Sequence, residues 1–140
     1  MPGVIDLDKS FHENYNQGQA TQLTAGAVGG STAGQLSPTT NAGAAPTVTI
    51  TDCTDRRGSF LLNPVTGGGA QAAGEVVQVR WLQSYGRAPG AILVTVENET
   101  DGNAAVTCAA ADVDANGFDL MVGSALTTAK AYRCQYLVIP

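Results

Sequence analysis

The stretch from Gly74 to Glu97 constrains the fold most, because it contains two strand-like runs joined by a connection that must turn. Within each run apolar and polar residues alternate, which is the pattern of a β-strand with one buried face. Between the runs, Pro89 has no amide hydrogen to give to a sheet, and Gly86 and Gly90 tolerate left-handed backbone angles. We therefore expect two strands with a turn or crossover between them. The apolar positions are Val77, Val79 and Trp81 in the first run and Ile92, Val94 and Val96 in the second.

Similar short runs, separated by turn signals, continue from residue 47 to residue 140. Seven or eight short strands without a convincing helix are typical of a β-sandwich, so we predict an all-β, antiparallel β-sandwich domain over residues 47–140. The predicted strands are 47–51, 59–62, 74–81, 91–96, 104–111, 118–122 and 132–138.

Residues 1–46 differ in kind, since Gly, Pro, Thr, Ser, Asn and Gln dominate and apolar residues are widely spaced. No helical or strand period runs through them, so alone they would not bury enough surface to offset the entropy of ordering. We predict an extended N-terminal arm, either a loose tail or, as we favour, a segment that orders on a partner. The residues expected to contact that partner are Val4, Ile5, Leu7, Phe11, Tyr15 and Leu23.

Composition narrows the class of partner. The formal net charge is −5 and the pI is about 4.5, which argues against nucleic acid, because that binding depends on neutralising phosphates with Lys and Arg. No apolar run approaches the ~18 residues of a membrane-spanning helix, and no signal-peptide core follows Met1, so we expect synthesis in the cytoplasm and no membrane partner. Charged residues make up only 14% of the chain, and such a surface suits repeated contacts within an assembly.

The three cysteines, Cys53, Cys108 and Cys134, form no C-x-x-C pair. Their number is odd, so neither a zinc site nor a closed disulfide framework is indicated. We interpret them as small buried side chains in a reducing compartment, with a Cys108–Cys134 disulfide as the alternative.

Residues for catalysis are sparse. The single histidine, His12, lies in the predicted arm, far in sequence from any nucleophile that it could activate. Paired acids such as Asp52 and Asp55 fall in turns, where solvated carboxylates are ordinary. We therefore predict no enzymatic activity and no cofactor.

The sharpest local motif begins at Asp112 and has the first half of a calcium-binding loop, D-x-D-x-N-G. Its oxygen donors would be Asp112, Asp114 and Asn116. The twelfth position is Gly123 where such a loop needs a bidentate Glu, and an Asn-Gly hairpin explains the same residues. We favour the hairpin and keep calcium binding as the alternative.

The aromatic residues Trp81, Tyr132 and Tyr136 lie on the apolar parity of their predicted strands. Core packing is the interpretation that we favour. A platform for sugars, with Tyr85 added, is the alternative if these side chains face outwards.

A family resemblance follows from the order of the structural motifs. The first motifs are Thr54-Asp55 with Gly58, then a Gly-rich loop that ends at Gly74, and then a strand with Val77, Val79 and Trp81. A connection with Tyr85 and Pro89 and the apolar strand 91–96 follow. The last motifs are Gly117-Phe118 and the pair Tyr132 and Tyr136. In this order they resemble the small β-sandwich domains of tailed-bacteriophage virion proteins. The resemblance covers residues 47–140, marks strand ends and turns, and carries over no catalytic residue.

The resemblance implies a structural role in the virion. An arm followed by a compact knob is similar to the layout of a late capsid decoration protein of the phage head. Such a protein binds the major capsid protein through its arm, projects the knob from the capsid surface, and is commonly a homotrimer. The alternative is the tip of a tail or head fibre that binds a host-surface glycan, with exposed loop residues such as Tyr85 or Arg87 in contact with it.

Overall fold

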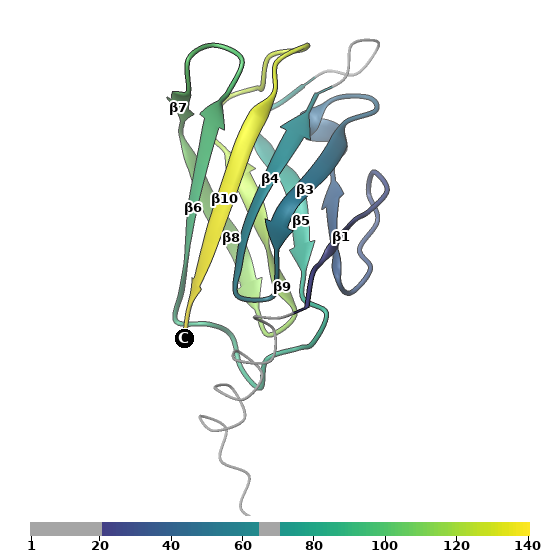
Figure 1. The fold of residues 1–140 in the computed structure, drawn as a ribbon, viewed down its shortest axis with the longest axis vertical. Coiled ribbons are helices and arrows are strands. Elements are labelled where there is room, and N and C mark those ends of the chain that lie inside the picture. The colour runs from purple at the N-terminus through teal and green to yellow at the C-terminus, as the bar shows by residue number, and fades with distance from the viewer. Residues whose placement is uncertain (1–20, 65–70) are drawn as a thin grey trace, which may run out of the picture.

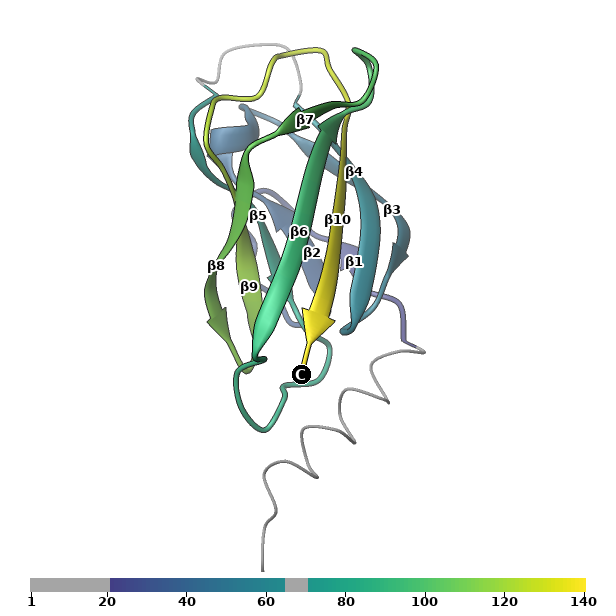
Figure 2. The ribbon, with the colours of Figure 1, turned by 90° about the vertical axis from the view of Figure 1, so that its left-hand side faces the viewer.

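The computed structural model describes residues 21–64 and 71–140, which fold into a sandwich of two five-stranded β-sheets. One sheet lies in front of the other in Figure 1, and Figure 2 shows the two layers from the side. The predicted fold class, an all-β sandwich, is confirmed. These described residues form ten strands, compared with the seven or eight predicted.

The rear sheet in Figure 1, here called sheet A, has the strand order β1-β2-β5-β9-β8. Its strands span, in that order, Thr24–Ala25, Gln35–Pro38, Gly74–Arg80, Gly117–Val122 and Cys108–Asp114. Neighbouring strands are antiparallel except β1 and β2, which pair in parallel over two residues. The predicted antiparallel arrangement therefore holds in sheet A for every pair but this one.

The front sheet, sheet B, has the order β3-β4-β10-β6-β7, and all its pairs are antiparallel. Its strands span Thr47–Cys53, Arg57–Asn63, Tyr132–Ile139, Ala91–Asn98 and Ala104–Val106. The C-terminal strand β10 lies in the middle of this sheet between β4 and β6, so the last residues of the chain help to organise the front layer.

All seven predicted strands are present, but one of them is divided. The Ala-rich run 104–111 forms β7 in sheet B and β8 in sheet A, and the chain changes sheets at Thr107. Figure 2 shows β7 lying across the upper end of the sandwich before β8 descends in the other layer. Small side chains of nearly uniform size give no period that marks such a crossing, so the sequence could not place it.

The predicted arm over residues 1–46 is corrected for residues 21–46, which belong to the sandwich. They supply β1, β2 and a 3-10 turn at Thr40–Ala42, and their apolar side chains enter the core. Leu36 is fully buried opposite Val79 of β5, and Leu23 is 2% exposed. These strands have two and four residues, too short to show a period, and long-range pairing orders them instead.

The core lies between the sheets and contains the inward-facing residues of both. Strand β10 shows the principle, because its residues alternate between buried and more exposed from Tyr132 to Ile139. Cys53 and Cys134 are fully buried and Cys108 is half-buried, all three as free thiols. The largest fully buried side chains are Trp81, Phe60, Phe118, Leu23, Leu36, Leu62 and Leu120.

Candidate functional site

Residues 21–64 and 71–140 contain no metal-binding cluster, because no three His, Cys, Asp or Glu side chains there lie so that they could hold an ion. His12 lies outside the described residues. No helix in the same ranges has the length and apolar character needed to cross a bilayer. The candidate sites are therefore surfaces, one at an end of the sandwich and one on the outer face of sheet B.

The three thiols are poorly suited to act as nucleophiles. Burial raises the pKa of Cys53 to about 12 and raises the pKa of Cys134 and of Cys108 as well. The thiolate is the reactive form, so a raised pKa keeps each sulfur protonated and inert at neutral pH. The cysteines act as packing residues in the sandwich.

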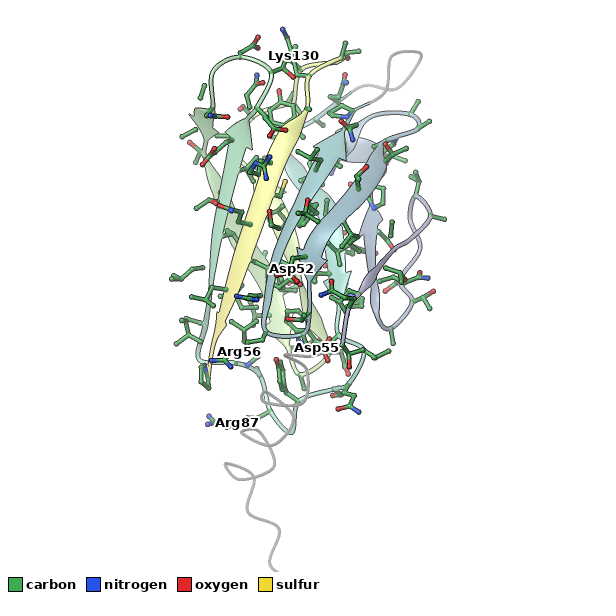
Figure 3. The ribbon with its side chains drawn as sticks, viewed as in Figure 1. Asp52, Asp55, Arg56, Arg87 and Lys130 are labelled. Carbon is green, nitrogen blue, oxygen red and sulfur yellow. The ribbon has the colours of Figure 1, made fainter. Side chains whose placement is uncertain are left out.

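A buried carboxylate organises the lower end of the sandwich, which in Figure 1 carries the β3–β4 turn and the C-terminus. Asp55, labelled in Figure 3, sits in that turn and is 1% exposed. Its Oδ1 accepts a hydrogen bond from the Leu82 amide at 2.8 Å, and its Oδ2 accepts one from the Gln83 amide at 3.1 Å. One side chain thereby fixes the start of the long β5–β6 connection against the front sheet.

The environment of Asp55 acts on its charge in two opposite ways. Burial raises the pKa of the carboxyl above its ordinary value, whereas the two amide hydrogen bonds act to lower it. Burial is the larger of these influences on the pKa of Asp55.

Two tyrosine hydroxyls hold the backbone of the same turn. The Tyr85 hydroxyl donates to the carbonyl oxygen of Asp55, and the Tyr136 hydroxyl donates to the carbonyl oxygen of Thr54 at 2.6 Å. The whole turn is thus held from inside the core.

The aromatic residues form one buried cluster behind this turn. The ring of Trp81 lies 5.7 Å from Phe118, 5.8 Å from Tyr85 and 6.0 Å from Tyr136, measured between centroids. Core packing, the favoured interpretation of Trp81, Tyr132 and Tyr136, is confirmed by their burial. The expectation that Tyr85 is an exposed loop residue is wrong: it is 2% exposed, because its ring completes the cluster.

A pocket of about 500 Å³ opens at the lower end, on the sheet A side of this cluster. Arg80 lines this pocket, and its guanidinium donates hydrogen bonds to Asp119 Oδ1 at 2.8 Å and to the Phe118 carbonyl oxygen at 3.0 Å. Asp119 is 5% exposed, so this ion pair is largely removed from water. The other lining residues are Ser31, Ala33, Trp81, Leu82, Ser84, Asp114 and Asn116.

The outer face of sheet B carries an exposed apolar patch formed by Leu93, Leu137 and Ile139. Leu93 on β6 lies directly opposite Leu137 on β10, and Ile139 follows on the same side of β10. Their exposed fractions are 59%, 42% and 37%. Of the five large exposed apolar residues in the described chain, three meet here, so the patch is a gathering and not scattered surface residues.

The first described residues run along the edge of the same sheet. The Leu23 amide donates to the Cys53 carbonyl oxygen at 2.7 Å, and the Gln22 side chain bonds both the Cys53 amide and Asp52 Oδ1. The described chain therefore begins beside the end of β3. In Figure 2 the described chain begins low on the side of sheet B.

Among the residues predicted to contact a partner, one is described. Leu23 is buried in the core of its own chain, next to β3, and is not available to a partner. The other five predicted contacts, Val4, Ile5, Leu7, Phe11 and Tyr15, lie outside the described residues.

The calcium-like motif forms a hairpin, as the favoured interpretation predicted. Strands β8 and β9 meet at a turn in which Asp114 Oδ1 accepts hydrogen bonds from the amides of Asn116 at 2.6 Å and Gly117 at 3.0 Å. This oxygen, which a calcium ion would need, is engaged by the turn itself. Asp112 has a left-handed φ of 48° at the bulge before the turn.

Comparison with protein-family models, with curated proteins and with solved structures found no match for this chain.

Sequence reasoning missed both surfaces, although one of them left a signal. β6 and β10 contain unbroken apolar runs, 91–94 and 136–139, in place of strict alternation. A strand that is apolar on both parities predicts that both faces of its sheet are covered. The Arg80–Asp119 pair gave no comparable signal, because the two residues meet only through the pairing of β5 with β9.

Proposed function

We propose that this chain is a non-enzymatic structural protein of a tailed-bacteriophage virion, a decoration protein of the head. Residues 1–20 bind the major capsid protein on the assembled capsid, and the sandwich projects outwards. The observation that carries the proposal is the layout of the chain. Residues 21–64 and 71–140 form a β-sandwich, and the segment that precedes them in the sequence has spaced apolar residues and is attached beside Gln22 at the edge of sheet B.

Mass action explains how such a protein would stabilise a capsid. A ligand that binds only the assembled lattice shifts the equilibrium towards that lattice, in proportion to its occupancy. Each contact of residues 1–20 would be weak alone, and a homotrimer on a symmetry axis would present three of them at high effective concentration. At about 3.3 Å per residue the segment reaches at most roughly 66 Å, enough to cross onto a neighbouring capsid subunit.

The experiment is binding of the purified protein to capsids that lack it. Deletion of residues 1–20 is expected to abolish co-sedimentation with capsids while the sandwich keeps its thermal unfolding transition. The deletion must end at residue 20, because removing Leu23 would open the core.

Replacement of Val4, Ile5, Leu7, Phe11 and Tyr15 by Ser should abolish capsid binding in the same way as the deletion. A matched control replaces the nearby Asn14, Asn16, Gln17 and Gln19 by Ser and should bind normally. Unchanged occupancy after the deletion would contradict the proposal.

A second candidate function is supported by the pocket at the lower end. Its volume of about 500 Å³ and its mixture of hydroxyl, amide, carboxylate and guanidinium groups suit the hydroxyls of a host-surface glycan. This would make the sandwich a receptor-binding tip. Glycan binding would then persist after deletion of residues 1–20 and be lost in Ser31→Ala or Asn116→Ala. A glycan array probed with the deleted protein separates the two functions, because the decoration role predicts no signal.

A further inference from the structure

We infer that the outer face of sheet B is a docking surface for residues 1–20 of the same chain, with Tyr15 and Phe11 packing on the patch of Leu93, Leu137 and Ile139. The inference does not depend on the virion role, because both partners belong to this chain. Three observations carry it: a furrow across the sheet, the point where the segment joins, and the sequence of the segment.

Two shallow hollows of about 260 and 160 Å³ lie on sheet B between its β3 edge and the apolar patch, and Gln135 and Tyr136 line both. We call this pair of hollows the furrow. The first begins at Asp52 and Arg57, and the second ends at Leu93 and Leu137. Ser59 on β4, which pairs with the exposed Gln135 on β10, presents only a short side chain in the first hollow.

The segment joins the sandwich at the β3 end of this furrow. The Gln22 side chain donates to Asp52 Oδ1 at 2.8 Å, and Asp52 is also a wall of the first hollow. From this point the patch lies across three strand spacings, from β3 over β4 and β10 to β6, or about 14 Å. Six extended residues, from Thr21 back to Tyr15, reach roughly 20 Å. Tyr15 is therefore the first apolar residue of the segment that can reach the patch, and Phe11 is the next.

The polar residues next to the attachment point agree with this placement. Residues 16–20, which would pass the start of the furrow, are Asn, Gln, Gly, Gln and Ala. The furrow begins beside Arg57, whose side chain is 61% exposed and whose partner Asp52 lies 3.3 Å away. The side-chain oxygens of Asn16, Gln17 and Gln19 can accept hydrogen bonds from this guanidinium, which has donors to spare.

Intramolecular docking needs little intrinsic affinity. A short tether holds the segment near its furrow at an effective concentration in the millimolar range, so a contact too weak for two separate molecules would still be populated. Two aromatic rings on three aliphatic side chains would supply such a contact, and the patch would be shielded from other molecules. If the proposed function holds, capsid subunits compete for the same residues, and the docked state is the form of the protein before assembly.

The first test places p-benzoylphenylalanine at position 15 of the full chain and maps the photo-cross-links by mass spectrometry. We expect cross-links within one molecule, on β6 and β10, with a yield that does not change with protein concentration. Cross-links confined to other strands would overturn the inference. Cross-links between two molecules that rise with concentration would overturn the same-chain assignment.

The second test measures chymotrypsin cleavage after Phe11 and Tyr15. Replacing Leu93 and Leu137 by Ser removes most of the apolar contact, so the initial cleavage rate should rise about tenfold. The control is Leu82→Ser, since Leu82 is 46% exposed but lines the pocket on the sheet A side and neither hollow of the furrow. Circular dichroism checks that each variant is folded. Equal rates in all three proteins would overturn the inference, whereas failure of capsid binding with protection intact would overturn only the proposed function.

Discussion

The ring of Tyr136 fills the space that a side chain on residue 58 would need. Gly58 on β4 and Tyr136 on β10 are direct partners across the two strands, and a Cβ on Gly58 would lie 2.0 Å from the Tyr136 ring. The same ring reaches the Thr54 carbonyl oxygen with its hydroxyl and packs against Phe118 at 5.4 Å. The missing side chain thus admits the aromatic ring that joins the β3–β4 turn to the core.

Gly58→Ala is expected to destabilise the sandwich by about 1–3 kcal/mol, the usual cost of overpacking a tight core. The ring of Tyr136 would have to move and weaken its hydrogen bond to Thr54. Urea unfolding measures the loss. In a Tyr136→Leu background the same substitution should cost much less, because the clash is gone. Equal costs in both backgrounds would show that the ring and Gly58 are not coupled.

Asp55→Asn is expected to change how stability depends on pH. The folded-state pKa of Asp55 is raised by burial above the ordinary 3.8, so the folded state binds its proton more tightly than the unfolded state. The stabilising contribution of protonated Asp55 is fully present below pH 3.8 and is lost as pH rises through the raised pKa. The unfolding free energy of wild type minus that of Asp55→Asn should therefore fall over this window. Urea titrations at several pH values measure it, and a constant difference would contradict the prediction.

Arg80→Met should destabilise the protein by about 2 kcal/mol, because it leaves the Asp119 carboxylate buried without its partner. Adding Asp119→Leu should recover part of this loss, since the uncompensated charge is removed. The control is Lys130→Met. That residue pairs with Asp101 on an exposed surface, and its loss should have little effect. Chemical unfolding of the four proteins completes the comparison.

The sequence predicts the position of a residue when its own strand alternates between apolar and polar residues. It does not predict the position of a residue whose strand forms only by pairing with a distant segment. The alternation from Val77 to Trp81 and from Tyr132 to Val138 indicates strands without knowledge of their partners. Leu36 gives no such signal, because β2 has only four residues and its burial depends on β5, some forty residues further along the chain. For this reason the sequence predicts an arm that ends at residue 46, although residues 21–46 belong to the sandwich.

The candidate surfaces follow the same division. The aromatic residues on the apolar side of a predicted strand are in the core, as the alternation of apolar and polar residues predicts. Tyr85 lies in a connection where no such alternation exists, so the sequence does not reveal that it is buried. The patch of Leu93 and Leu137 needed the register of β6 with β10 before it could be recognised. Spacing along the sequence cannot report a contact made across a sheet.

The thiols should react slowly with a small disulfide reagent in the folded protein. Cys53 and Cys134 are fully buried with raised pKa values, and half-buried Cys108 should react first. Cys108→Ser removes that faster phase and serves as the control. If all three thiols of the folded protein react with the reagent as fast as they do in denaturant, the burial of these residues is contradicted.

The burial of Leu23 gives the prediction that bears most on function. Deletion of residues 1–20 should change the unfolding free energy by about 1 kcal/mol or less, because the only contact that we infer for this segment is a peripheral one. Leu23→Ala, by contrast, removes a core side chain that is 2% exposed and should cost about 2–5 kcal/mol. Val28→Ala, in the same stretch and 38% exposed, is the control and should be nearly neutral. If Leu23→Ala is also neutral, residues 21–46 are not part of the cooperative unit, and the partner-binding arm extends beyond residue 20.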